Sequence, residues 1–95
     1  MMILPDVFYT NTALRMNHAR VFHYIRACGP SWTVITYNDI HGNTAVSKPL
    51  IRGVLATLID AGLLERHSIG SHRNSFFEYR IPPHIAEEMP HGDDT

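Results

Sequence analysis

Residues 47–62 restrict the possible folds most, because they predict an amphipathic helix with a defined start and a defined end. Ser47 is a common helix-capping residue, and Pro49 suits the first turn, where a helix does not need the backbone N–H. Gly62 terminates the pattern. In between, apolar residues recur on one face, at Ile51, Leu55 and Leu58, flanked by Val54 and Ile59. We predict a helix over 47–61 that buries this face in a core.

The preceding residues predict a helix, a strand and a second, short helix. Apolar residues at helical spacing run over about 12–28 and stop at a Gly-Pro pair. The β-branched and aromatic run SWTVIT at 31–36 indicates a strand. Thr36 is followed three residues later by Asp39, a variant of the capping box. The second helix therefore begins at Tyr37.

The remaining pattern predicts a turn and a β-hairpin. Poor helix formers shorten the second helix, so residues 42–46 are expected to form a turn between two helices. After the third helix, residues 62–69 turn into an extended run, and residues 70–75 are a polar turn. The run FFEYRI at 76–81 alternates, which places one set of side chains on a common face: Phe77, Tyr79 and Ile81.

Composition divides the chain into three parts. Residues 1–11 are an apolar segment, residues 12–83 are the folded domain, and residues 84–95 form an acidic tail that we expect to be disordered. The whole chain has a net charge of −1, but four of its 9 acidic residues lie in the tail, which has no Lys or Arg. Residues 1–83 thus hold all 8 basic and five acidic residues, so the folded part is mildly basic.

The order helix, strand, helix, turn, helix, hairpin resembles the winged helix-turn-helix family, and the spacing of several residues is similar too. That family commonly has an acidic residue and Ile in its second helix, a Ser cap seven residues later, and apolar residues at fixed steps up to Gly-Leu-Leu. The matching residues here are Asp39-Ile40, Ser47, Ile51, Leu55, Leu58 and Gly62-Leu63-Leu64. The resemblance covers roughly residues 14–81. It implies an α+β winged helix-turn-helix fold, with three helices, a small antiparallel sheet and a C-terminal β-hairpin wing.

Two features depart from the family pattern. Thr44 stands where the family usually has an apolar residue that pins the second helix to the core, so we expect that helix to be loosely held. Along its most exposed line, the third helix has mostly small side chains and few hydrogen-bonding groups. Proteins that read base edges usually have Arg, Asn, Gln or Ser at these positions. This line consists of Pro49, Gly53, Ala56 and Asp60, flanked by Leu50, Arg52 and Thr57.

The family's docking mode implies that the start of the third helix and the hairpin tip contact double-stranded DNA. Backbone N–H groups and the Ser47 hydroxyl would bind a phosphate, and Lys48 would add charge. Arg52 is the best candidate for a guanine edge, because its guanidinium is bidentate. The hairpin tip suits phosphates or a narrow minor groove. The expected DNA-binding set is Thr44, Ser47, Lys48, Leu50, Arg52, Gly53, His72, Arg73 and Asn74.

The mild charge predicts weak, salt-dependent binding by a single copy, which a homodimer would remedy. The opening run MMILPDVFY contains more apolar residues than a small monomer readily leaves exposed. Two arrangements are open. The segment either covers the domain's own sheet, or it joins Met16 and Phe22 in a homodimer interface.

The sequence offers no metal site, cofactor site or catalytic motif. His18 and His23 fall on different helix faces, and His67 and His72 flank a turn without a nearby Cys, so no known ligand spacing is met. His18 is expected to be structural. No nucleophile–base pair, Gly-rich phosphate loop or paired carboxylates occur at motif spacing. We therefore expect a protein that is not an enzyme and that binds no cofactor.

The expected location is the cytoplasm. No apolar run is long enough to cross a bilayer, the first residues lack the pattern of a secretory signal, and the single Cys28 cannot form an internal disulfide.

Together these features predict a small winged-helix regulator that controls transcription or replication by occupying double-stranded DNA, as a homodimer. The alternative is a winged helix that docks on a protein of the transcription or replication machinery. In that case the contact surface would be the smooth one around Pro49, Leu50, Gly53 and Ala56.

Overall fold

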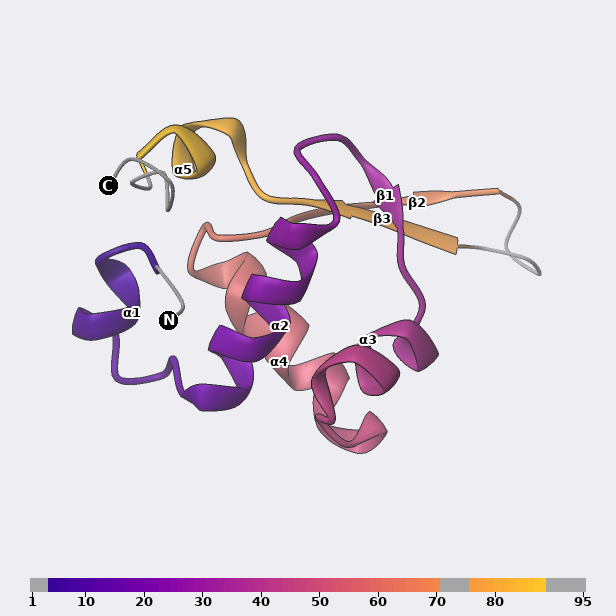
Figure 1. The fold of residues 1–95 in the computed structure, drawn as a ribbon, viewed down its shortest axis with the longest axis horizontal. Coiled ribbons are helices and arrows are strands. Elements are labelled where there is room, and N and C mark those ends of the chain that lie inside the picture. Colours follow the sequence, from indigo (N-terminus) through magenta and orange to yellow (C-terminus); the bar gives the residue numbers. More distant parts are fainter. Residues whose placement is uncertain (1–3, 71–75, 89–95) are drawn as a thin grey trace.

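The computed structural model describes residues 4–70 and 76–88, which form an α+β fold with helices packed beneath a small sheet (Figure 1). Three helices form the helical layer, and each buries one of its faces. They are α2 (Met16–Ala27), α3 (Tyr37–Thr44) and α4 (Lys48–Asp60). The helices predicted from apolar spacing are therefore present, although α2 begins four residues later than expected from the pattern over 12–28.

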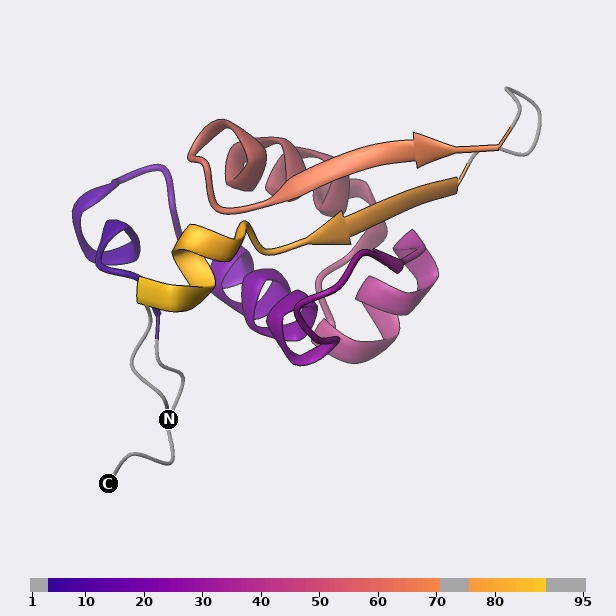
Figure 2. The same ribbon diagram turned by 90° about the horizontal axis from the view of Figure 1, so that it is seen from above.

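The sheet has three antiparallel strands in the order β1-β3-β2. β2 (Glu65–Ile69) and β3 (Phe76–Arg80) form the predicted hairpin, and β1 (Thr33–Val34) adds to the other edge of β3. The strand predicted over 31–36 is thus limited to two residues. The hairpin projects beyond the helical layer, so its base is covered by the core and its outer half extends past it (Figures 1 and 2).

The core lies between the helical layer and the inner face of the sheet. Tyr79 of β3 is 1% exposed, which confirms the face predicted from the alternation in FFEYRI. The largest fully buried side chains are Val21, Phe22, Ile25, Ile40, Ile51, Leu55, Leu58, Leu63 and Tyr79. The apolar face of the helix predicted over 47–61 is therefore buried as expected.

The junction between α3 and α4 differs from the predicted turn over 42–46. α3 continues through Gly42 and Asn43 to Thr44, and Ala45 then adopts a left-handed conformation with φ 63°. This single left-handed residue reverses the chain before α4. The predicted start of α3 is confirmed, because the Thr36 hydroxyl accepts from the Asp39 amide at 3.1 Å and the Asp39 carboxylate accepts from the Thr36 amide at 3.0 Å.

The N-terminal segment packs on the domain's own core. A short helix, α1 (Val7–Thr10), brings the Phe8 ring to 5.1 Å from that of Phe22, measured between centroids. Phe22 is fully buried, so its predicted place in a homodimer interface is wrong. The segment covers α2 rather than the sheet. Its partly buried residues are Leu4, Val7 and Phe8.

The predicted disordered tail from residue 84 is also corrected. Residues Pro83–Glu88 form a helix, α5, and Ile85 and Ala86 pack against the core. Apolar contact of these two residues with the core therefore orders the first part of the tail. Residues 89–95 lie outside the described part of the chain.

Candidate nucleic-acid interface

The start of α4 is exposed, as the expected DNA-binding role requires. Ser47 is the N-cap residue, and its carbonyl accepts a hydrogen bond of 2.9 Å from the Leu50 amide. The predicted capping position of Ser47 is therefore confirmed, although its hydroxyl makes no capping hydrogen bond. This leaves the exposed hydroxyl of Ser47 available to an external group, together with the first backbone N–H groups of the helix.

The outward face of α4 presents the remaining predicted residues of this helix. Lys48, Arg52 and Gly53 are exposed, and Leu50 has 52% of its surface exposed. A Cβ added at Gly53 would meet no atom within 4 Å, so packing inside the chain does not require glycine there. The face therefore combines two cations, one apolar side chain and a stretch of open backbone.

Thr44 does not belong to this surface. Its side chain is buried, its hydroxyl donates to the Ile40 carbonyl at 2.6 Å, and the Val46 amide donates to that hydroxyl at 3.2 Å. His41 supports the same junction, because its Nδ1 lies 2.9 Å from the Val46 carbonyl oxygen. Thr44 thus anchors the end of α3 by hydrogen bonds, which corrects both its assignment to DNA and the expectation of a loosely held helix.

The other predicted contacts lie at the hairpin tip. His72, Arg73 and Asn74 fall within residues 71–75, outside the described residues. Their role stays a prediction.

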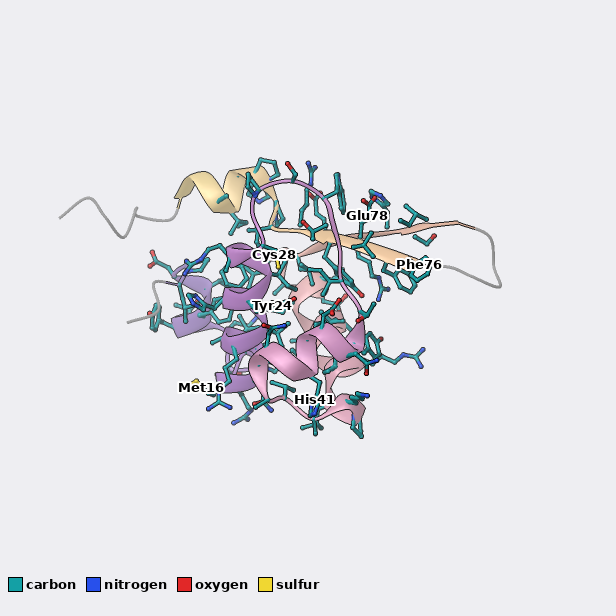
Figure 3. All side chains as sticks on the ribbon, turned by 45° about the vertical axis from the view of Figure 1, so that its right-hand side comes forward. Met16, Tyr24, Cys28, His41, Phe76 and Glu78 are labelled. Carbon is teal, nitrogen blue, oxygen red and sulfur yellow. The ribbon has the colours of Figure 1, made fainter. Side chains whose placement is uncertain are left out.

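The outer face of the hairpin, away from the helices, carries charges that are already paired. Arg80 Nε lies 2.7 Å from Glu65 Oε1, and His67 Nε2 lies 2.7 Å from Glu78 Oε1. The Trp32 ring contacts both pairs, at 4.6 Å from the Arg80 guanidinium and 4.0 Å from the His67 ring. Figure 3 shows Glu78 on the side of the sheet opposite α3. Two carboxylates make this face unsuitable for a polyanion.

The inner face of the hairpin has a different character. Arg66 and Tyr79 are cross-strand partners, and the Arg66 guanidinium lies 4.9 Å from the centre of the Phe77 ring. Burial raises the pKa of the Tyr79 hydroxyl, and a hydrogen bond with Arg66 opposes that rise. Tyr37, at the start of α3, raises the same pKa further, and it follows by two residues Ile35, whose amide donates to the Phe77 carbonyl. Sequence analysis missed these residues, because only the strand register shows which cation shares a face with the aromatic rings.

The cations on α4 and on the inner face of the hairpin differ from those on its outer face in their ion pairing. Among the described side chains, those of residues 4–70 and 76–86, no carboxylate lies within ion-pair distance of Lys48, Arg52 or Arg66. The hairpin also projects toward the end of the molecule at which α4 begins (Figures 1 and 2). An external anion would therefore displace no carboxylate of the described side chains when it binds these three cations.

A second candidate site is a shallow, open hollow between α2 and α3. It is lined by Arg20, His23, Tyr24, Ala27, Asn43 and Thr44. Tyr24 and Cys28 lie near each other on α2 (Figure 3). Burial, with contributions from Cys28 and Asp39, raises the pKa of the Tyr24 hydroxyl to about 12. Because this phenol stays protonated at neutral pH and the Thr44 hydroxyl is engaged within the chain, the hollow has no activated nucleophile among its lining residues.

His18 has a structural position. Its Nδ1 accepts a hydrogen bond of 3.0 Å from the Arg15 amide at the start of α2. Burial, and then the nearby Arg15 charge, lower the pKa of the imidazole. Across residues 4–70 and 76–88, no group of three or more His, Cys, Asp or Glu side chains could hold a metal ion. The absence of a metal, a cofactor and catalytic activity stays a prediction.

Comparisons with protein-family models, curated proteins and solved structures found no match to this chain. In the part of the chain that the structure describes, none of the helices combines the length and the apolar character that a membrane span requires.

Proposed function

We propose that this chain is a winged helix-turn-helix protein that binds double-stranded DNA and regulates transcription or replication by occupying its site. The observation that carries the proposal is the pair of cations on the outward face of α4. Lys48 and Arg52 are exposed and have no carboxylate partner among the described side chains. A helix that carries unpaired cations beside a projecting hairpin fits the contacts that such proteins make with the DNA backbone and grooves.

The division of charge between the hairpin faces supports the same orientation. The outer face neutralises its own charges through Arg80–Glu65 and His67–Glu78, whereas Arg66 on the inner face is unpaired within the described chain. A duplex that approaches α4 would therefore meet cations and avoid the hairpin carboxylates. The paired outer face offers no excess of positive charge that would attract DNA.

The small number of cations implies weak binding by one copy, so we include a homodimer in the proposal. Two copies on adjacent half-sites would double the phosphate contacts without any change in the individual interface. The residues that remain free for such an interface include Tyr9 and Met16, which are 72% and 60% exposed. Sedimentation at micromolar concentration tests this part, and a monomer mass both with and without DNA would contradict it.

The proposed function competes with docking of the same helix on a protein, which the exposure of Leu50 favours. A pair of variants separates the two. Arg52→Ala should weaken binding to a mixed-sequence duplex at low salt, whereas Leu50→Asp should abolish a protein contact. Arg20→Ala is the matched control, because it removes one exposed positive charge from α2 and leaves α4 intact. If wild-type protein binds no duplex even at low salt, the DNA proposal is wrong.

A further inference from the structure

The inner face of the hairpin carries an exposed group of aromatic rings with one guanidinium. Phe77 is 39% exposed and Tyr37 is 37% exposed, although the neighbouring Tyr79 is fully buried. The ring centroids of Phe77 and Tyr79 are 6.4 Å apart, and the Arg66 guanidinium lies over Phe77. The group is thus anchored on the core at Tyr79 and open to solvent at Phe77, Tyr37 and Arg66.

The backbone holds this group in a fixed arrangement. The Ile35 amide donates to the Phe77 carbonyl at 3.3 Å, and Tyr37 follows two residues later as the first residue of α3. Arg66 is fixed from the other side, because β2 pairs with β3 at Arg66 and Tyr79. A ring from β3 and a cation from β2 are therefore in contact on one surface, and the chain that leads into α3 is hydrogen-bonded to the same strand two residues before Tyr37.

This surface combines a cation with exposed aromatic rings, and a single class of ligand can bind both. The guanidinium has no carboxylate partner among the described side chains, so it favours an anion. The aromatic rings and the plane of the guanidinium favour a flat, apolar face. A nucleotide offers both, as a phosphate and a base. In an intact duplex, however, each base face is covered by its neighbours in the stack, and only base edges and phosphates are accessible.

We propose that Arg66, Phe77 and Tyr37 bind an unstacked nucleobase of DNA, next to the duplex that α4 holds. This inference rests on the proposed function and adds a preference to it. The chain should bind a duplex that contains an unpaired base more tightly than the same duplex fully paired, because an unpaired base has already lost much of the stacking that the ring would have to replace.

Binding to two labelled duplexes tests the preference, one fully paired and one with a single unpaired base in an otherwise identical sequence. Stacking of a base on an aromatic side chain is worth roughly 5- to 150-fold in affinity, so a gain in this range is expected for the wild-type protein. Phe77→Leu should remove the gain and leave affinity for the paired duplex within about twofold, since the lost ring contributes only when a base is unstacked.

Phe76→Leu is the matched control. Phe76 is 51% exposed, neighbours Phe77 on the same strand, and alternation directs it to the opposite face of the sheet (Figure 3 labels it at the outer end of β3). This variant should keep the full preference. Arg66→Gln provides a second test that leaves the aromatic packing in place, and it should reduce the preference as well. Circular dichroism of each variant establishes that the fold is retained.

The outcomes separate this inference from the proposed function. Equal affinity of wild-type protein for both duplexes overturns the stacking site and leaves DNA binding by α4 in place. A preference that survives in both Phe77→Leu and Arg66→Gln also overturns it. Absence of binding to either duplex overturns both proposals. A fluorescent base analogue at the unpaired position supplies a direct readout, because its emission should fall when it stacks on wild-type protein and stay constant with Phe77→Leu.

Discussion

The Thr44 hydroxyl donates a hydrogen bond of 2.6 Å to the carbonyl oxygen of Ile40, and the same hydroxyl accepts from the Val46 amide. This bond joins the last turn of α3 to the chain that leads into α4. The amide of Val46 is part of a buried residue, so its hydrogen bond replaces contact with water that burial has removed. The Thr44 hydroxyl therefore ties the end of α3 to the segment that leads into α4.

Thr44→Val tests this connection with a side chain of nearly the same shape. The change leaves the Val46 amide without a partner, so the free energy of unfolding should fall by about 1–3 kcal/mol. Thr44→Ser keeps the hydroxyl and should lose less. Urea denaturation of the three proteins measures the difference, and equal stability of Thr44→Val and wild type would show that the hydroxyl is dispensable.

Ala45 provides a second test of the same junction. Its φ of 63° is unfavourable for a residue with a Cβ, whereas glycine adopts it without steric cost. Ala45→Gly should therefore raise the free energy of unfolding by up to about 1 kcal/mol, after the larger entropy of the unfolded glycine chain is taken into account. Ala45→Val should lower it. Thermal denaturation checks the order, and a loss of stability in Ala45→Gly would contradict the left-handed conformation.

Sequence patterns were sufficient for the main elements and insufficient for their junctions. The spacing of Ile51, Leu55 and Leu58 predicts a buried helix face directly, because the apolar residues of such a face recur in the sequence at the period of the helix. The left-handed conformation of Ala45 has no such signal, since alanine favours helix, and here the Ala45 amide donates to the His41 carbonyl at the end of α3. α5 was also missed, because contact of its residues with the core outweighs their weak local pattern.

The candidate site shows the same limit. Exposure of Lys48 and Arg52 follows from their place opposite the apolar face of α4, and the sequence predicts it. The pairing of Arg80 with Glu65, and the separate position of Arg66 over Phe77, depend on the register between β2 and β3. A shift of one residue would exchange the two faces, so charge alone could not assign these arginines.

The two predicted helix caps should differ in their effect on stability. Thr36→Ala removes a side-chain hydrogen bond to the Asp39 amide and should cost about 1 kcal/mol. Ser47→Ala removes no capping hydrogen bond, so it should cost only a few tenths of a kcal/mol. Chemical denaturation of both variants gives the comparison. A larger loss for Ser47→Ala than for Thr36→Ala would contradict the observed hydrogen bonding.

His18 should make stability depend on pH. Because the pKa of His18 is lowered in the folded protein, the unfolded chain binds a proton more tightly than the native state. The contribution of neutral His18 to the free energy of unfolding is thus fully present above the ordinary histidine pKa of about 6.5. It is lost as the pH falls through the lower pKa of the folded state.

His18→Asn isolates this effect, because Asn keeps a hydrogen-bond acceptor near the Arg15 amide but does not titrate. Stability measured between pH 7 and about pH 5 should fall less steeply in this variant than in wild type. Identical slopes would show that other histidines account for the pH dependence.

The most direct test of the account is the salt dependence of binding to a mixed-sequence DNA duplex, for wild-type protein and for the double variant Lys48→Ala/Arg52→Ala. Each cation that neutralises a phosphate contributes about one unit to the slope of log affinity against log salt concentration. The account predicts measurable binding at low salt for the wild type, and a slope that is shallower by about two units in the double variant. No binding by the wild type, or the same affinity and slope in the double variant, would contradict the proposal that α4 binds DNA.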